Sequence, residues 1–264
     1  MAQQKTIGAQ ESQALPTVRN IGIAELRQAL SRGIADFMAK PSHLILIVLI
    51  YPIVGSFMMR ATFGYDILPL LFPLIAGFTL IGPLAAVGLY EISRRREMGL
   101  DVSYWNAFDV LKSPSVPAIA AIGLLQMAIY FMWLGAAQII YDATFGAMVP
   151  ENLGQFVLAV ITTPQGWTLL VVGSLVGFLF AVLVLSISAV SFPLLLDKDI
   201  GAVAAIQTSV RAFVANPKTM LLWGFIVATS LVLGCIPLFV GLAVVMPVLG
   251  HTTWHIYRIV VEPE

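Results

Sequence analysis

Two histidines near the C-terminus have a spacing that could hold a metal ion. His251 and His255 are four residues apart, and on a helix this spacing places both imidazoles on one face. Such a pair could ligate a metal or approach a haem. HxxxH is a weak signal by itself, because a metal needs further ligands and hydrogen bonds that orient them. Further candidates at a similar depth are Glu91 and His43.

The alternative is that both histidines are hydrogen-bonding residues at the rim of a membrane. Trp254 and Tyr257 lie among them, and amphipathic aromatic residues collect where a bilayer meets water. His255 could then reach a carboxylate such as Glu91 at a neighbouring helix end. We favour this interpretation, and therefore expect no cofactor.

A basic cluster forms the second candidate site. Three consecutive arginines attract anionic lipid at about 1 kcal/mol each, and Glu91 could pair with Arg258 or His255. We favour a topology anchor with a helix-end ion pair, and the alternative is a contact with an anionic lipid headgroup or a partner protein. The residues of this predicted contact are Glu91, Arg94, Arg95, Arg96 and Arg258.

Other chemistries find little support in the sequence. A hydrolase would lack its base, because all three histidines lie at the predicted cytoplasmic rim, and no serine or cysteine accompanies them in a recognisable motif. The single cysteine, Cys235, excludes an intramolecular disulfide and a cysteine-based metal site. The formal net charge of +0 gives no bulk attraction for nucleic acid. We expect a protein that is not an enzyme and does not bind nucleic acid.

The composition indicates that helices in a membrane position these residues. Hydrophobic residues make up 59% of the 264 positions and charged residues 11%, whereas soluble domains carry about 25% charged residues. The mean hydropathy is +0.93. So much apolar surface requires hydrocarbon around it, and apolar runs near 20 residues are typical of transmembrane helices.

Six such runs are predicted, with five as the alternative. The last 39-residue stretch is too long for one helix, and Gly234–Pro237 divides it into a hairpin. All the Lys and Arg residues except Arg60 then lie on one side, which the positive-inside rule makes cytoplasmic. Both termini are predicted to be cytoplasmic. The expected spans are Pro41–Met59, Leu68–Ile92, Val116–Tyr141, Gly166–Leu196 and two within Thr219–Tyr257.

A threefold repeat is predicted within this all-α fold. An amphipathic segment precedes each of Lys40-Pro41, Ser113-Pro114 and Asn216-Pro217, so each unit would be an amphipathic helix, a proline and a two-span hairpin. The alternative is that an amphipathic segment precedes any membrane hairpin, in which case the pattern is not a repeat. The apolar stripe of the first segment is Ile23, Leu26, Leu30, Ile34 and Phe37, and the expected N-caps of the second and third are Ser103 and Asp199. Residues 1–20 are expected to be a disordered cytoplasmic N-terminus, and 21–258 a single six-helix transmembrane domain.

Two motifs resemble those of a known family. Gly88–Glu97 reads GLYEISRRRE and His251–Arg258 reads HTTWHIYR, and with them the chain resembles DUF2189, a family of uncharacterised bacterial integral membrane proteins. The likeness runs from the first amphipathic segment to Arg258. It implies a location in the bacterial inner membrane and brings no activity. The stretch from Ser191-Phe192-Pro193 to Asn216-Pro217 is more weakly similar to a wider set of six-span proteins, including the membrane domain fused to some glycerophosphodiester phosphodiesterases.

Three functions are compatible with these observations. The first is an accessory or scaffold protein that packs against membrane lipids or a larger membrane complex. The second is a small-molecule or lipid transporter, which is disfavoured because the spans carry amides such as Gln126 and Gln138 but no clear ionisable residue near mid-membrane. The third is a haem- or metal-binding membrane protein that uses His251 and His255.

Overall fold

The computed structural model describes residues 15–39, 73–74, 80, 82–146, 153–237 and 240–262. Its named elements in these ranges are all helices, which confirms the predicted all-α class. The predicted span Pro41–Met59 and His43 lie outside the described residues, as do residues 68–72, 75–79 and 81 of the predicted span Leu68–Ile92.

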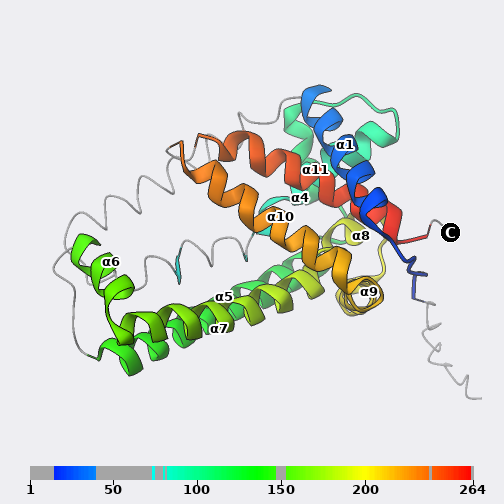
Figure 1. The fold of residues 1–264 in the computed structure, drawn as a ribbon. Coiled ribbons are helices and arrows are strands. Elements are labelled where there is room, and N and C mark those ends of the chain that lie inside the picture. The colour runs from blue at the N-terminus through cyan, green and yellow to red at the C-terminus, as the bar shows by residue number, and fades with distance from the viewer. Residues whose placement is uncertain are drawn as a thin grey trace, which may run out of the picture.

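Three long apolar helices run through the molecule. They are α5 (Val116–Phe145), α7 (Pro164–Ser188), which continues into the short α8 (Ser191–Asp197), and α10 (Pro217–Cys235). Within the described ranges, these three are long and apolar enough to cross a membrane by length and composition. They correspond to the third, fourth and fifth predicted spans, and α5 and α7 lie side by side (Figure 1).

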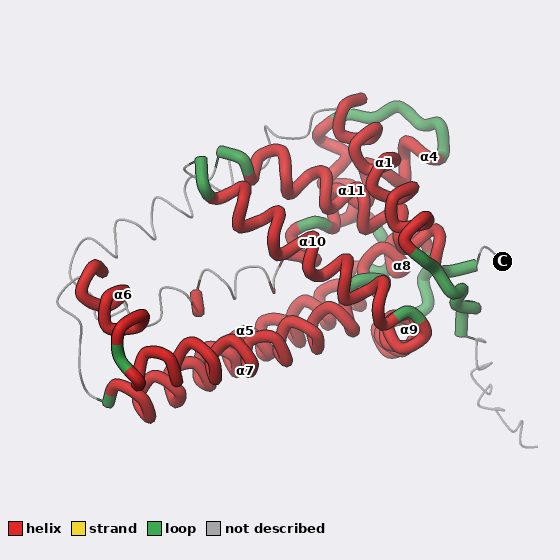
Figure 2. The backbone as a smooth tube through the Cα atoms, viewed as in Figure 1, coloured by secondary structure: helices red, strands yellow, loops and turns green. Residues whose placement is uncertain are grey.

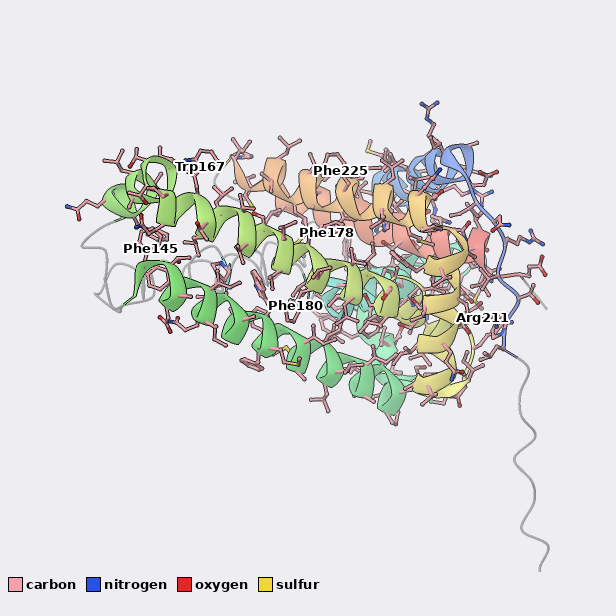
Figure 3. All side chains as sticks on the ribbon, turned by 60° about the horizontal axis from the view of Figure 1, so that its bottom comes forward. Phe145, Trp167, Phe178, Phe180, Arg211 and Phe225 are labelled. Atoms are coloured by element: carbon pink, nitrogen blue, oxygen red, sulfur yellow. The ribbon has the colours of Figure 1, made fainter. Side chains whose placement is uncertain are left out.

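The outer surface of these helices is apolar. Figure 3 shows Phe178 on α7 and Phe225 on α10, and both side chains are exposed, at 56% and 67%. Phe180 instead packs on Trp133 of α5, with ring centroids 5.7 Å apart. Apolar residues on every face are typical of a helix surrounded by hydrocarbon or by other apolar helices.

The remaining helices gather at the two ends of this bundle. At one end, α6 (Leu153–Thr162) packs beside the start of α7 (Figure 1). At the other lie α1 (Ile23–Ala39), α4 (Val87–Glu97), the 3₁₀ helix η2 (Tyr104–Lys112) and α9 (Gly201–Ala215). α11 (Leu242–Val260) runs beside α10 and brings its C-terminal half to the same end (Figures 1 and 2). We call α1, α4, η2, α8 and the C-terminal half of α11 the polar end.

The first and last described helices pack closely there. Gly33 of α1 lies against Thr252 of α11, and a Cβ atom at Gly33 would sit 2.7 Å from the backbone nitrogen of Thr252. On the other side of α11, Gly250 faces Leu89 of α4. Because a side chain at Gly33 would overlap backbone, this crossing requires glycine.

The two ends of the described chain are paired. The backbone N–H of Arg19 donates to Val260 O at 2.8 Å, and that of Glu262 donates to Thr17 O at 3.0 Å. The Arg19 guanidinium also pairs with the Glu262 carboxylate at 2.9 Å. Backbone pairing thus joins residues 17–19 to residues 260–262, and the predicted domain limits at residues 21 and 258 stay predictions.

Asn216 joins this paired segment to the turn between α9 and α10. Its Oδ1 accepts from the backbone N–H of Ile21 at 2.7 Å, and its Nδ2 donates to Arg19 O at 2.9 Å. The Asn216-Pro217 helix start is confirmed, since α10 begins at Pro217. After Ser113-Pro114, α5 begins two residues later, at Val116, and Lys40-Pro41 lies outside the described residues.

The amphipathic segments are found as α1, η2 and α9. The second is a 3₁₀ helix, and Ser103 is its N-cap as predicted, with Asn106 Oδ1 accepting from the Ser103 N–H at 2.7 Å. The predicted N-cap Asp199 is wrong: Ile200 occupies that position, and the Asp199 carboxylate accepts from the Ser115 hydroxyl at 3.3 Å.

The hairpin after α10 is confirmed in part. The helix ends at Cys235 and α11 begins at Leu242, so the long C-terminal stretch is broken where Gly234–Pro237 predicted. α11 is not among the three helices apolar enough to span a membrane by composition. The six-span count and the threefold repeat therefore stay predictions.

Candidate functional site

The predicted site residues lie on two helices of the polar end. Glu91 and the three arginines belong to α4, while His251, His255 and Arg258 belong to α11. α11 packs against both α1 and α4. The structure thus brings the two predicted clusters together, around a residue of α1 that neither prediction included.

That residue is Asp36, whose carboxylate is buried. Its Oδ2 accepts from the Ser93 hydroxyl at 2.6 Å and lies 2.8 Å from Nε2 of His255. Its Oδ1 accepts from Nη1 of Arg96 at 2.6 Å. One side chain therefore fastens α1 to α4 and to α11 at once.

His251 extends the same network. Its Nδ1 lies 2.8 Å from the Ser93 hydroxyl oxygen, and both residues are almost completely buried. A hydroxyl has one proton, so the direction of the Ser93–His251 contact depends on the tautomer of the imidazole. The chain of bonds is His255, Asp36, Ser93 and His251, and we call these four residues with Arg96 the Asp36 network.

The Asp36 network favours an ionised carboxylate. Burial raises the pKa of Asp36, but the hydrogen bonds from His255 and Ser93, together with the nearby histidines, outweigh burial and hold that pKa below its ordinary value. The Arg96 guanidinium supplies the countercharge at Oδ1. A buried charge is tolerated when it is paired and hydrogen-bonded, and both conditions hold here.

A second set of bonds joins α11 to the ends of α4 and α8. Arg258 donates from Nε to Glu97 Oε1 and from Nη1 to Asp197 Oδ2, both at 3.0 Å. Asp197 also accepts from the Tyr257 hydroxyl, and Glu97 from the Trp254 indole at 2.9 Å. The suggested pairing of Arg258 with Glu91 is therefore not the one observed.

Glu91 is bonded within its own helix. It accepts from Nε and Nη2 of Arg94 at 2.7 and 2.9 Å, one turn further along α4. Since Arg94 already provides this two-point bond and His255 faces Asp36, the suggested partnership of Glu91 with His255 is also not observed. Glu91, Arg94 and Arg95 line a pocket of about 570 Å³ that also borders η2.

Residues 71–197 match the family model of DUF2189, described as a predicted integral membrane protein. This match confirms the predicted family. The DUF2189 region contains Gly88–Glu97, the first of the two motifs that carried the resemblance, whereas His251–Arg258 follows the region. No curated protein and no solved structure matches the chain.

The DUF2189 region and α11 thus share one buried polar network. Its Ser, His and Asp residues are types that serve catalysis, yet Ser93 bonds directly to Asp36, and all three are buried. In a hydrolytic triad the imidazole stands between the other two groups. The observed arrangement instead connects helices.

Among the described residues, the structure adds no further metal ligand to His251 and His255. In the parts of the chain that are described, no group of three or more His, Cys, Asp or Glu side chains could hold a metal ion. Nδ1 of His251 faces Ser93 and Nε2 of His255 faces Asp36. Metal or haem binding by these histidines stays a prediction.

Sequence reasoning missed Asp36, although a signal was present. The buried face of α1 runs through Leu26, Ala29, Gly33 and Phe37, and Asp36 lies on it. Of the predicted stripe, Ile23 and Ile34 are exposed. An acidic residue next to Phe37 and one turn from a glycine indicates a buried carboxylate with a partner.

Proposed function

We propose that this protein is a non-enzymatic accessory or scaffold protein of the bacterial inner membrane, which packs against lipid or a larger membrane complex. The observation that carries the proposal is the Asp36 network. The side chains best suited to chemistry are buried, and they bond to one another across three helices. Hydrogen bonds of this kind hold the three helices together, which is a structural role rather than a catalytic one.

The polar end, which the Asp36 network holds together, lies at the end of three helices with exposed apolar surfaces. α5, α7 and α10 expose large apolar side chains, which would be costly in water and are suited to lipid or to partner helices. These side chains include Leu124, Phe131, Leu175, Phe178, Phe225 and Val232.

The pairing of the described chain ends supports the proposed orientation. Val18 and Val261 lie side by side at the polar end, as expected if both termini are on one side of the membrane. The arginines of α4 lie at the same end, and the positive-inside rule favours the cytoplasm for such a cluster.

The test is purification of the tagged, full-length protein in a mild detergent, followed by mass spectrometry of what remains bound. An accessory protein should bring down a larger complex in reproducible stoichiometry. A matched variant, Phe225→Arg, places a charge on the exposed face of α10 and should reduce this association while leaving the polar end folded.

Two results would contradict the proposal. One is a protein that purifies alone under every mild condition and moves a solute across proteoliposomes, which would favour the transporter. The other is stoichiometric metal or haem in the purified protein, which would favour the cofactor alternative.

A further inference from the structure

The pocket beside η2 combines charges that the proposed scaffold role does not use. It lies where α4 ends, along η2, and ahead of the start of α5. Its charged lining residues are Glu91, Arg94, Arg95, Asp109 and Lys112. Three cations face two carboxylates, so this lining carries a surplus of one positive charge.

The two carboxylates hold the three cations in place. Glu91 receives the two-point bond from Arg94. Asp109 accepts from Nη1 of Arg95 at 3.2 Å and from Nζ of Lys112 at 2.6 Å. Hydrogen bonds from Lys112 and Asn106 lower the pKa of Asp109, so it stays ionised and keeps both cations oriented. A pre-oriented set of donors binds an anion at a smaller entropic cost.

The cation at the mouth of the pocket retains donors for a ligand. The Lys112 side chain is 81% exposed. An ammonium has three N–H donors, and the bond to Asp109 uses one of them. The Arg95 side chain is about a quarter exposed, so it too can be reached from outside.

An apolar surface adjoins these charges. η2 exposes Trp105 at 78%, Phe108 at 53% and Leu111 at 72%, and the rings of Trp105 and Phe108 have centroids 6.2 Å apart. η2 comes directly before α5, a helix able to span a membrane. A tryptophan-bearing apolar face beside lysine and arginine is typical of an element lying in the membrane interface.

We propose that this pocket binds the phosphate of an anionic phospholipid, while Trp105, Phe108 and Leu111 insert beside its acyl chains. A phosphodiester with one negative charge would neutralise the surplus positive charge of the pocket. A zwitterionic lipid would bring its own cation and gain less. The proposal rests on the membrane-embedded part of the proposed function. It assigns the lipid contact to Arg94, Arg95 and Lys112, which line the pocket, rather than to Arg96 and Arg258, which are not among its lining residues.

Lipid binding to the full-length protein in detergent tests the proposal. Short-chain phosphatidylglycerol and phosphatidylcholine would be titrated separately and bound lipid counted by native mass spectrometry. We expect tighter binding of phosphatidylglycerol, weakened by added salt. Lys112→Gln should weaken it about five-fold, since each basic residue contributes about 1 kcal/mol to anionic lipid binding. The matched control is Lys218→Gln, an exposed lysine outside the pocket, which should leave binding unchanged.

A second variant distinguishes binding of a phospholipid from binding of a free anion. Trp105→Gln keeps the cations and should weaken phosphatidylglycerol binding without affecting the fold, because the side chain is exposed. Equal binding of the two lipids, an unchanged affinity in Lys112→Gln, or displacement by inorganic phosphate at equal concentration would each overturn the proposal. The proposal would also be overturned if an acidic peptide at equal concentration displaced bound phosphatidylglycerol from the pocket.

These outcomes do not depend on a partner complex. Lipid selectivity without a co-purifying complex would support the pocket and count against the scaffold role, and the reverse result would support the scaffold role alone.

Discussion

Nε2 of His255 lies 2.8 Å from Oδ2 of Asp36, although 219 residues separate them in the chain. This contact joins the first described helix to the last. Ser93 and Arg96 bring α4 to the same carboxylate. The geometry of the polar end therefore depends on one buried charge.

Removing that charge should destabilise the protein strongly. Asp36→Ala would leave Arg96 and His255 without their shared partner, and breaking a buried pair costs about 3–5 kcal/mol. Thermal unfolding followed by circular dichroism in detergent measures the effect. Gln28→Ala, at an exposed position of the same helix, is the control. Equal melting temperatures for the two variants would mean that the network contributes little.

The same carboxylate should make stability fall in acid. Its pKa is lower in the folded protein than its ordinary value, so its contribution is complete above about pH 3.9 and is lost as the pH falls through the folded pKa. Melting temperatures measured from pH 7 down to acid should therefore drop more steeply in the wild type than in Asp36→Asn. Parallel curves would assign the acid sensitivity to other groups.

Gly33→Ala should also destabilise, for a steric reason. The added methyl would overlap the backbone of Thr252 and force α1 away from α11, and overpacking of this kind costs about 1–3 kcal/mol. Gly135→Ala, on α5, meets nothing within 4 Å and should be neutral or slightly stabilising. Chemical denaturation of both variants distinguishes this packing effect from a general preference for alanine in helices.

His255→Gln should be tolerated. Glutamine also offers a donor and an acceptor, so its amide can replace the bond to Asp36, and we expect a folded helical protein of similar thermal stability. Elemental analysis and a visible spectrum of the wild type complete the experiment. One equivalent of metal or haem that disappears in the double variant His251→Gln, His255→Gln would make cofactor binding the leading function.

A reporter that is active only outside the cytoplasm tests the topology. Fusions at both termini should be silent and a fusion within Asp142–Gln165 should be active, because nearly all basic residues are predicted on the opposite side. Activity at the C-terminus alone would require an odd number of spans.

The class of protein and its long helices follow from local features of the sequence. α5, α7 and α10 were predicted because an apolar run of bilayer length is a local property, which no distant contact can change. The start of α10 at Pro217 and the break after Cys235 are local as well, since they follow from the backbone limits of proline and glycine.

Which polar groups meet depends on how the helices pack, and the sequence alone did not predict it. Glu91 bonds to Arg94, one turn away on α4, and not to the more distant Arg258 or His255 that the sequence suggested. Asp36 became the centre of the site because Gly33 lets α1 approach α11 closely enough for its carboxylate to reach His255. A buried polar group must find a partner, but the sequence does not specify which one, because that choice depends on how helices distant in the chain cross.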